Sequence, residues 1–365
     1  MDIVYFNRDA ECADRERVQN RQLARLRLML DELLASNPFY QRKLREVGVE
    51  HVTDILTLDD LRNLPFTTKA ELVADHEANP PFGSDLTYPL SRYKRIHQTS
   101  GTTGKPMRWL DTEDSWQWWG RCWATVLRAA GVDEEDRVYF AFSFGPFIGF
   151  WSAWEGVRQI GALTISGGAH SSEQRLEGLL DIDATVVCCT PSYALHLAKV
   201  AEEIGLADQL RESKVRAIIV AGEPGGSIPN TRERIQELWG AKVYDHTGAT
   251  EVGAHGYTCL YQCGVHLNEG EFIVEVLDPQ TDEPSDEGEL VITNLGRVGS
   301  PVIRYRTGDH VRLNRESCAC GRSYVRMEGG VLGRMDDMIT VRGINVFPSA
   351  VENIVRFFPE VDEFA

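Results

Sequence analysis

The sequence has 365 residues, with 38 Lys and Arg against 55 Asp and Glu, so its formal net charge is −17. This sign argues against nucleic acid or an anionic membrane surface as the main partner. Hydrophobic residues make up 42% and charged residues 25% of the chain, which is typical of a globular protein and excludes a disordered, collagenous or membrane chain. The length allows two domains, or one large α/β body with an appendage.

The start of the sequence and its eight cysteines indicate the compartment. Residues 1–18 carry scattered charges rather than the apolar core of a signal peptide, and no apolar run long enough to span a membrane follows. We therefore expect a cytoplasmic protein without disulfides, whose cysteines bind a metal, react or fill the core. Core filling is expected for Cys12, Cys122, Cys188 and Cys189.

The first part of the chain, residues 1–89, is predicted to be a helical region packed on the body. Leucines at helical spacing predict an amphipathic helix over residues 14–37, which Pro38 ends. Thr68 with Glu71 three residues later predicts the capping box of another helix.

The second and third parts differ in their patterns. In residues 90–265, short apolar runs alternate with helical stretches from residue 137 onwards, which predicts a mostly parallel sheet covered by helices. In residues 266–335, strands and turns follow one another without helices, which predicts an antiparallel β-subdomain. Ligands of such sheets bind beyond the carboxyl ends of the parallel strands.

A loop rich in glycine and hydroxyl groups stands near the start of the second part. Glycines let backbone N–H groups turn toward an anion, hydroxyls add donors and Lys105 adds charge, so the loop can cradle phosphates. It is not a Walker A loop, because only two residues separate its glycines and Pro106 stands where Ser or Thr would bind magnesium. Taken alone, such a loop is more often a surface turn. Its residues are Thr99, Ser100, Gly101, Thr102, Thr103, Gly104 and Lys105.

Three further segments give this loop a context. They are residues 244–251 (YDHTGATE), 305–309 (YRTGD) and 333–348 (GRMDDMITVRGINVFP). Their order and spacing, together with HQTSGTTGKP around the loop and NVFP near the end, resemble the phenylacetate-CoA ligase branch of the adenylate-forming superfamily of acyl-CoA synthetases. The resemblance runs from about residue 90 to the last residues.

The resemblance implies an α/β fold with mostly parallel sheets wrapped by helices, plus an antiparallel β-subdomain. It also implies an AMP-forming acid–thiol ligase that joins an aromatic carboxylate to the α-phosphate of ATP, releases pyrophosphate and passes the acyl group to CoA. In such an enzyme the loop with Lys105 would hold the departing phosphates, and Glu251 would bind Mg²⁺. Asp309 would accept hydrogen bonds from both ribose hydroxyls. Outside the motifs, Glu251 and Asp309 would be a helix-start acid and a turn residue.

The same match implies the rest of the nucleotide site. Residues 222–224 follow a predicted strand and match the segment that lies against adenine. The chain departs from the branch at Thr247, where relatives usually carry an aromatic residue whose ring lies on adenine. Besides the loop, the residues expected to bind the nucleotide are Gly222, Glu223, Pro224, Asp245, His246, Thr247, Thr250, Asp309 and Arg334.

A segment of aromatic residues and glycines, residues 140–151, stands where the branch has its acid pocket, and such walls suit an aromatic acid. His246 occupies a position where relatives often carry an aliphatic residue. A polar donor there favours a ring with an amino or hydroxyl group, as in a substituted benzoate or an anthranilate-like acid, although a lone histidine is more often structural. The residues expected to contact the acid are Phe142, Phe147, Ala221, His246 and Gly248.

Cysteines and a histidine from two separated segments predict a structural zinc site. Cys318 and Cys320 precede a glycine, as in a metal knuckle, and His266 adds an imidazole. Three thiolates and one imidazole suit tetrahedral Zn²⁺ with no open position. The residues alone allow either Cys259 or Cys263 as the fourth ligand, and the pattern in related ligases favours Cys259.

The resemblance assigns residues 336–365 to a hinge and the start of a small C-terminal lid domain. Asp336 matches the hinge, and the lid of the superfamily supplies a catalytic lysine. Since the sequence stops shortly after Asp336, we expect a shortened form that binds ATP and acid but turns over slowly. Two other functions remain open: loading a carrier protein instead of CoA, and non-catalytic nucleotide binding. A homodimer is also left open.

Overall fold

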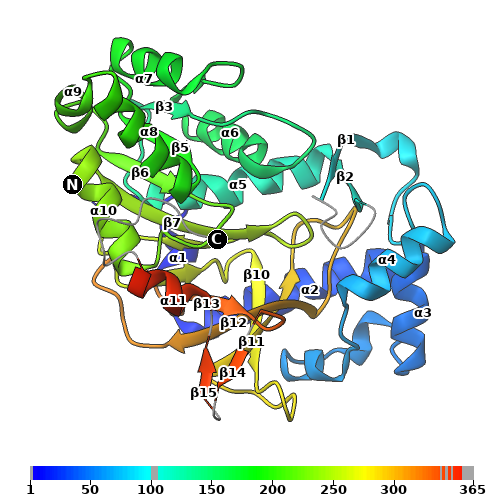
Figure 1. Cartoon of the computed structure of the whole chain (residues 1–365). Coiled ribbons are helices and arrows are strands. Elements are labelled where there is room, and N and C mark those ends of the chain that lie inside the picture. The colour runs from blue at the N-terminus through cyan, green and yellow to red at the C-terminus, as the bar shows by residue number, and fades with distance from the viewer. Residues whose placement is uncertain (1–2, 100–105, 338, 342–343, 347, 356–365) are drawn as a thin grey trace.

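The computed structural model describes residues 3–99, 106–337, 339–341, 344–346 and 348–355. Within them the main element is an 11-stranded sheet with strand order β10-β11-β12-β13-β9-β8-β7-β6-β5-β3-β4 (Figure 1). Its parallel strands are β3 (Arg137–Phe140), β4 (Leu163–Ser166), β5 (Val186–Cys189), β6 (Ala217–Val220) and β7 (Lys242–Ala249). This part confirms the predicted α/β fold with helices around parallel strands.

Alternating side chains of the parallel strands belong to two separate cores. Val138 and Phe140 pack in the core on the side of α5 and α6, whereas Tyr139 packs in the core on the side of the other helices. A strand that is buried on both faces has no polar face, which explains the continuous apolar runs in the sequence. The covering helices are α5 (Glu113–Ala129), α6 (Gly149–Ile160), α7 (Ser172–Asp181), α8 (Pro191–Glu203), α9 (Ala207–Arg211) and α10 (Pro229–Trp239).

The antiparallel strands extend the same sheet. The chain reverses after β7 and pairs as β8 antiparallel to it, so the antiparallel part begins before residue 265. The division at residues 89, 265 and 335 stays a prediction. The antiparallel strands are β8 (Gly253–Thr258), β9 (Val265–Leu267), β10 (Phe272–Leu277), β11 (Glu287–Asn294), β12 (Tyr305–Asn314) and β13 (Arg326–Arg334).

The N-terminal helices pack against this antiparallel part. The predicted first helix is α2 (Arg15–Ser36), and Asn37 both ends it and caps the next helix, so Pro38 begins a helix rather than only ending one. The predicted capping box of Thr68 and Glu71 is present at α4. The side chain of Gln22 donates to the carbonyls of Glu269 and Phe272, which ties α2 to the sheet. The other elements here are α1 (Arg8–Glu11), α3 (Pro38–Glu46), η1 (Val52–Asp54), η2 (Asp59–Asn63) and α4 (Lys69–Ala78).

Short elements outside the main sheet complete the described chain. A hairpin of β1 (Tyr93–Gln98) and β2 (Arg108–Thr112) carries the glycine-rich loop at its tip. The remaining elements are η3 (Leu90–Arg92), β14 (Ile339–Val341), β15 (Ile344–Val346) and α11 (Pro348–Val355). Among the described residues, no helix combines the length and the apolar composition needed to cross a bilayer.

Candidate active site

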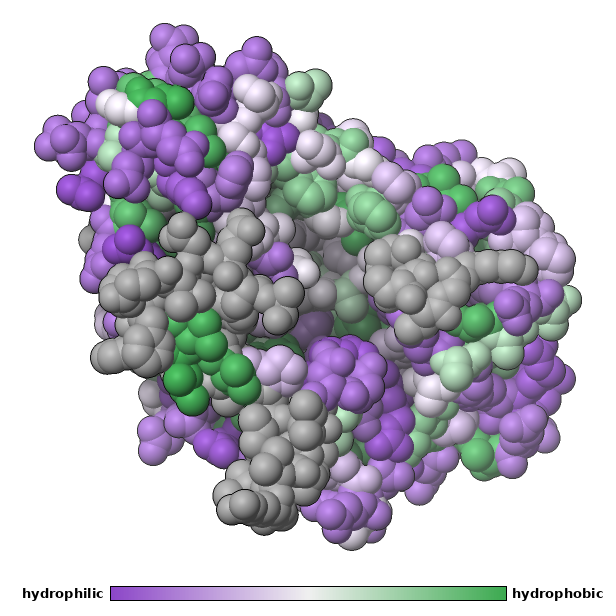
Figure 2. Space-filling model, in the orientation of Figure 1, coloured by the Kyte–Doolittle hydropathy of each residue, from purple (hydrophilic) through white to green (hydrophobic). Residues whose placement is uncertain are grey.

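A cavity of about 720 Å³ lies at the carboxyl ends of the parallel strands, where β7 turns into β8. The molecule is hollowed near the centre of the face seen in Figure 2. Five of the aromatic and aliphatic wall residues come from α5 and from the segment before α6, and motif residues from distant parts of the sequence meet them here. The predicted residues in its lining are Thr99, Phe142, Phe147, Ala221, Gly222, His246, Gly248, Thr250, Glu251, Arg334 and Asp336.

Most of the glycine-rich loop lies outside the described residues: Ser100, Gly101, Thr102, Thr103, Gly104 and Lys105. The base of the loop is described. The backbone N–H of Thr99 donates to the carbonyl of Met107 at 3.0 Å, and the N–H of Met107 donates to the Thr99 hydroxyl at 3.1 Å. These two bonds join Thr99 and Met107, the described residues on either side of the loop, at the end of the β1–β2 hairpin.

Glu251 lies in the tight turn between β7 and β8 and is 8% exposed. No hydrogen bond or ion pair joins its carboxylate to another described residue, although it lines the cavity. A buried carboxylate without a protein cation is suited to bind a metal ion. The Glu251 carboxylate therefore fits its predicted role as a ligand of Mg²⁺.

His246 stands on β7 between the cavity and β8. Its Nδ1 is 2.7 Å from the carbonyl oxygen of Gly256, which can only accept, so Nδ1 carries the proton. Burial lowers the pKa of His246 to about 3, so the ring is neutral and Nε2 is a hydrogen-bond acceptor. The expectation of a donor at this position is thus wrong. A Cβ on Gly248 would lie 3.0 Å from Nε2, so the glycine leaves space in front of this nitrogen.

The first cavity, which holds the residues predicted to contact the acid and is called the acid cavity for that prediction, also has wall residues that the sequence pattern did not single out. Trp119 and Trp123 of α5 line it, and the Trp123 ring lies 4.1 Å from the His246 ring. Trp119 and Trp123 are four residues apart, so they share one face of the helix. This spacing is visible in residues 116–123 (WQWWGRCW) and could have indicated an aromatic helix face. Of the predicted rings, Phe142 is partly buried while Phe147 is 43% exposed at the rim.

A second cavity, of about 270 Å³, shares Gly222, His246, Gly248 and Arg334 with the first. The predicted nucleotide residues Glu223, Pro224, Asp245, Thr247 and Asp309 also line it. The hydroxyl of Thr247 has no hydrogen-bond partner within the described parts of the chain, and position 247 carries no aromatic residue.

Charged groups at this second cavity have specific partners. Asp245 accepts a short hydrogen bond from the Ser227 hydroxyl, and burial raises the pKa of Asp245 to about 6. Asp309 is paired with Arg334 at 3.2 Å across β12 and β13, and burial raises the pKa of Asp309. The Glu223 carboxylate accepts from the backbone N–H of Ser192 at 2.6 Å.

Asp336 is exposed in the turn after β13. Its carboxylate lies 3.2 Å from Nε of Arg334, the residue that also contacts Asp309. The predicted hinge residue is therefore connected to the second cavity through Arg334.

The predicted metal ligands come together near the end of β8 and on β9, the strand that pairs with β8. One ligand atom from each of Cys259, His266, Cys318 and Cys320 lies within 4.8 Å of all the others, and all four residues are buried. Nδ1 of His266 is 3.1 Å from the Tyr324 carbonyl, so Nδ1 carries the proton and Nε2, 3.5 Å from the Cys320 sulfur, is a free acceptor. The donor set fits a tetrahedral Zn²⁺ ion.

Cys263 lies at the edge of this cluster. It is exposed, its sulfur is 3.4 Å from that of Cys318, and it accepts a hydrogen bond from Arg326 at 3.1 Å. The two candidates for the fourth ligand therefore differ in burial, with Cys259 inside the cluster and Cys263 outside it.

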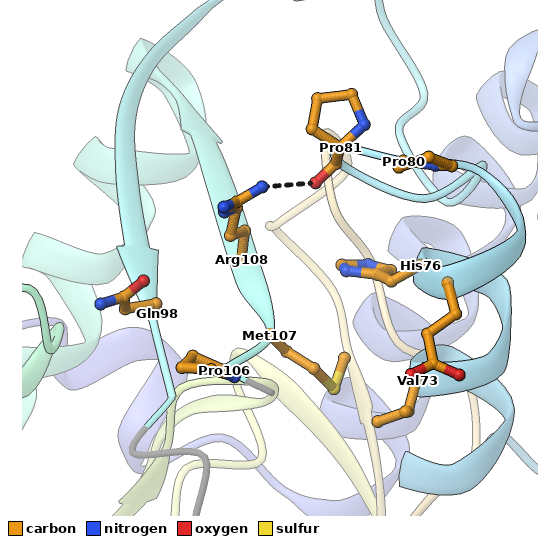
Figure 3. A pocket seen from close by; sticks show the side chains of 9 residues that line it. Val73, His76, Pro80, Pro81, Gln98, Pro106, Met107 and Arg108 are labelled. Atoms are coloured by element: carbon orange, nitrogen blue, oxygen red, sulfur yellow. Dashed lines mark hydrogen bonds between the residues drawn. The ribbon is translucent and has the colours of Figure 1, made fainter. Parts of the chain in front are cut away.

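A further pocket, of about 770 Å³, lies between α4 and the β1–β2 hairpin. Figure 3 shows Arg108 reaching the Pro81 carbonyl, with Gln98 and His76 on opposite walls. Nε2 of His76 is hydrogen-bonded to the Asp85 carboxylate at 3.2 Å. None of the predicted site residues that the structure describes lines this pocket.

Comparisons with known proteins agree with these motifs. The family described as AMP-binding enzyme matches residues 12–296. The phenylacetate-coenzyme A ligase of Thermus thermophilus is 33% identical over 364 residues, which are 98% of this chain and 79% of that protein. The phenylacetate-coenzyme A ligase of Escherichia coli is 34% identical over 354 residues, which are 95% of this chain and 78% of that protein.

A solved structure is also similar over nearly the whole chain. The crystal structure of a 2-hydroxyisobutyryl-CoA ligase in the postadenylation state, in complex with 2-HIB-AMP, has a TM-score of 0.91 at 29% identity and covers 97% of this chain and 76% of its own. Together, the motifs, the fold and these relatives show that the chain belongs to the AMP-binding enzymes, in the phenylacetate-CoA ligase branch of the adenylate-forming ligases.

Proposed function

We propose that the protein activates an aromatic carboxylic acid with ATP, forming an acyl-AMP and releasing pyrophosphate, and then transfers the acyl group to the thiol of CoA. The observation that carries this proposal is the joining of two cavities. One has aromatic walls from Trp119, Trp123 and Phe142, and the other has the carboxylates of Asp245 and Asp309. An acid in the first and a nucleotide in the second would meet beside Glu251.

Different residues would bind different parts of the nucleotide. The loop of residues 99–105, with Lys105, would hold the β- and γ-phosphates through backbone N–H groups and one positive charge. Asp309 would accept from the ribose hydroxyls with the oxygen that Arg334 leaves free. Residues 222–224 would lie against one face of adenine, with Asp245 and Thr247 at its edge.

Magnesium would be held by Glu251. When bound, the ion would neutralise charge that develops on the pyrophosphate leaving group. The turn between β7 and β8 keeps the carboxylate buried, and no cation of the described residues pairs with it, so its negative charge is available to a metal.

The acid is inferred to carry a hydrogen-bond donor on its ring, such as an amino or hydroxyl group. His246 offers Nε2 as an acceptor, and Gly248 leaves room in front of it. A substituent that can only accept would leave this buried nitrogen without a partner, which costs binding free energy. A substituted or anthranilate-like benzoate therefore fits these walls better than phenylacetate.

The test is ATP–pyrophosphate exchange across a panel of acids, followed by detection of the CoA thioester. The panel contains aminobenzoates, hydroxybenzoates, benzoate, phenylacetate and 2-hydroxyisobutyrate. We expect exchange to be fastest with a donor-substituted benzoate. Faster exchange with the aliphatic acid would contradict the aromatic assignment, exchange without thioester formation would favour a carrier-protein acceptor, and no exchange with any acid would favour a non-catalytic protein.

We also propose that Cys259, His266, Cys318 and Cys320 bind a structural Zn²⁺. The hydrogen bond from Cys259 lowers the pKa of Cys320, which makes Cys320 a thiolate more easily than a free cysteine. The cluster joins β8, β9 and the segment before β13, so a bound ion would connect three parts of the antiparallel sheet.

A further inference from the structure

A completely buried ion pair lies directly behind the turn that carries Glu251. Arg297, in the segment between β11 and β12, donates from Nε and Nη2 to the two carboxylate oxygens of Asp111 at 2.7 and 2.8 Å. Both side chains are 0% exposed. Asp111 belongs to β2, the strand that leaves the glycine-rich loop.

The third nitrogen of the same guanidinium reaches the turn itself. Nη1 of Arg297 donates to the carbonyl oxygen of Thr250 at 2.6 Å and to that of Glu251 at 3.4 Å. A guanidinium is planar and its donors are fixed relative to one another. The orientation of the turn is therefore set relative to the carboxylate of Asp111 on the hairpin.

Two tryptophans hold the guanidinium in this plane. Its carbon lies 5.1 Å from the ring centre of Trp109 and 5.3 Å from that of Trp119. Trp109 is on β2, and Trp119 lines the acid cavity. The arginine thus contacts the hairpin of the phosphate loop, the turn of Glu251 and a wall of the acid cavity.

The energetics of this arrangement argue for a positional role. Burying an ion pair costs desolvation free energy, and apolar residues of similar volume often stabilise a core equally well or better. An apolar pair, however, could not hold two backbone carbonyls of a turn in one orientation. The Glu251 carboxylate has no partner among the described side chains, so its position depends on the turn, whose backbone Arg297 holds.

We infer that Arg297 and Asp111 are positioning residues, which fix the turn of Glu251 relative to the β1–β2 hairpin, so that the Glu251 carboxylate is held where it would bind the Mg²⁺ of Mg²⁺–ATP. This inference rests on the proposed binding of magnesium by Glu251. It adds two residues that touch neither nucleotide nor acid, yet determine how strongly magnesium improves ATP binding.

The test compares ATP affinity, measured by calorimetry, in buffer with excess Mg²⁺ and in buffer without added metal. The ratio of the two dissociation constants is the magnesium gain. We expect Glu251→Gln to abolish the gain, and Arg297→Lys to reduce it about tenfold or more, the scale for residues that orient metal ligands. A lysine keeps the charge but cannot donate to Asp111 and to two carbonyls in one plane.

Arg304→Lys is the matched control. Arg304 is also buried, pairs with both oxygens of Glu275 at 3.0 and 2.9 Å and donates to the carbonyls of Arg62 and Leu64, and none of these residues lines the two site cavities. We expect it to lower the melting temperature as much as Arg297→Lys does, with an unchanged magnesium gain. If Arg297→Lys does not fold, Asp111→Asn, which keeps the shape of the side chain, takes its place in the comparison.

The possible outcomes distinguish the positioning role of Arg297 from the proposed binding of Mg²⁺ by Glu251. A normal magnesium gain in Arg297→Lys, with a lost gain in Glu251→Gln, overturns the positioning role and leaves the role of Glu251 intact. An equal loss in Arg304→Lys also overturns it, because the effect would then be general loosening. A normal gain in Glu251→Gln refutes the magnesium assignment and the inference with it.

Discussion

The Nδ1 proton of His246 is held by the carbonyl of Gly256 at 2.7 Å, and this bond leaves the other ring nitrogen as an acceptor beside the acid cavity. The tautomer is set by β8, the strand next to the one that carries the histidine. The chemistry that this wall offers a substrate therefore depends on strand pairing.

We expect His246→Ala to weaken the preference for a donor-substituted benzoate over unsubstituted benzoate by about two- to tenfold, because a neutral hydrogen bond contributes about 0.5–1.5 kcal/mol. Calorimetry with both acids measures this preference. His246→Gln restores an acceptor oxygen, and we expect it to regain part of the preference. Equal preferences in all three proteins would make the histidine a structural residue only.

Glu251→Gln should slow acyl-adenylate formation on the order of a hundredfold, since it removes a preorganised charge from the position of the metal ion. ATP–pyrophosphate exchange at saturating acid measures the rate. Glu269→Gln changes a carboxylate that is also buried but accepts from the backbone N–H of Val325, pairs with Arg15 and lines neither of the two site cavities, and it should leave the rate unchanged. A fully active Glu251→Gln protein would refute the magnesium assignment.

Metal analysis of protein prepared without chelators should find close to one zinc per chain. Because such a site contributes folding free energy, Cys320→Ser and Cys259→Ser should lower the melting temperature far more than Cys263→Ser. A larger loss of zinc in Cys263→Ser than in Cys259→Ser would reverse the choice of the fourth ligand. Protein free of zinc would remove the site.

Acid should destabilise the fold through three buried histidines, His97, His246 and His255, because burial lowers the pKa of each. Burial lowers the pKa of His246 to about 3 and that of His255 to about 4, from an unfolded value near 6.5. Below pH 6.5 the unfolded chain therefore binds protons that the folded chain does not, so stability is full above this pH and falls as the pH is lowered toward 4.

Urea unfolding at pH 7 and pH 5 measures this effect. Each histidine should contribute about 2 kcal/mol to the decrease in the free energy of unfolding from pH 7 to pH 5. His255→Gln should make the loss smaller by that amount, whatever its effect at pH 7. The same loss in the variant and in the parent protein would show that His255 takes up protons in the folded state.

The sequence by itself determined the local structure and the family. Apolar runs that alternate with helical stretches were enough to predict parallel strands covered by helices, because a strand that is buried on both faces needs apolar residues throughout. The capping box of Thr68 and Glu71 and the order of the motifs were also visible in the sequence. Each of these signals depends on residues that are close together along the chain.

Only the tertiary structure decided how distant residues act together. It joined the antiparallel strands to the parallel ones in one sheet, brought Trp119 and Trp123 to the acid cavity, and made His246 an acceptor through Gly256. It also paired Asp111 with Arg297 across the molecule. A charged residue in the sequence carries no sign of its partner, because burial and hydrogen-bond direction arise only when strands far apart in the chain pack side by side.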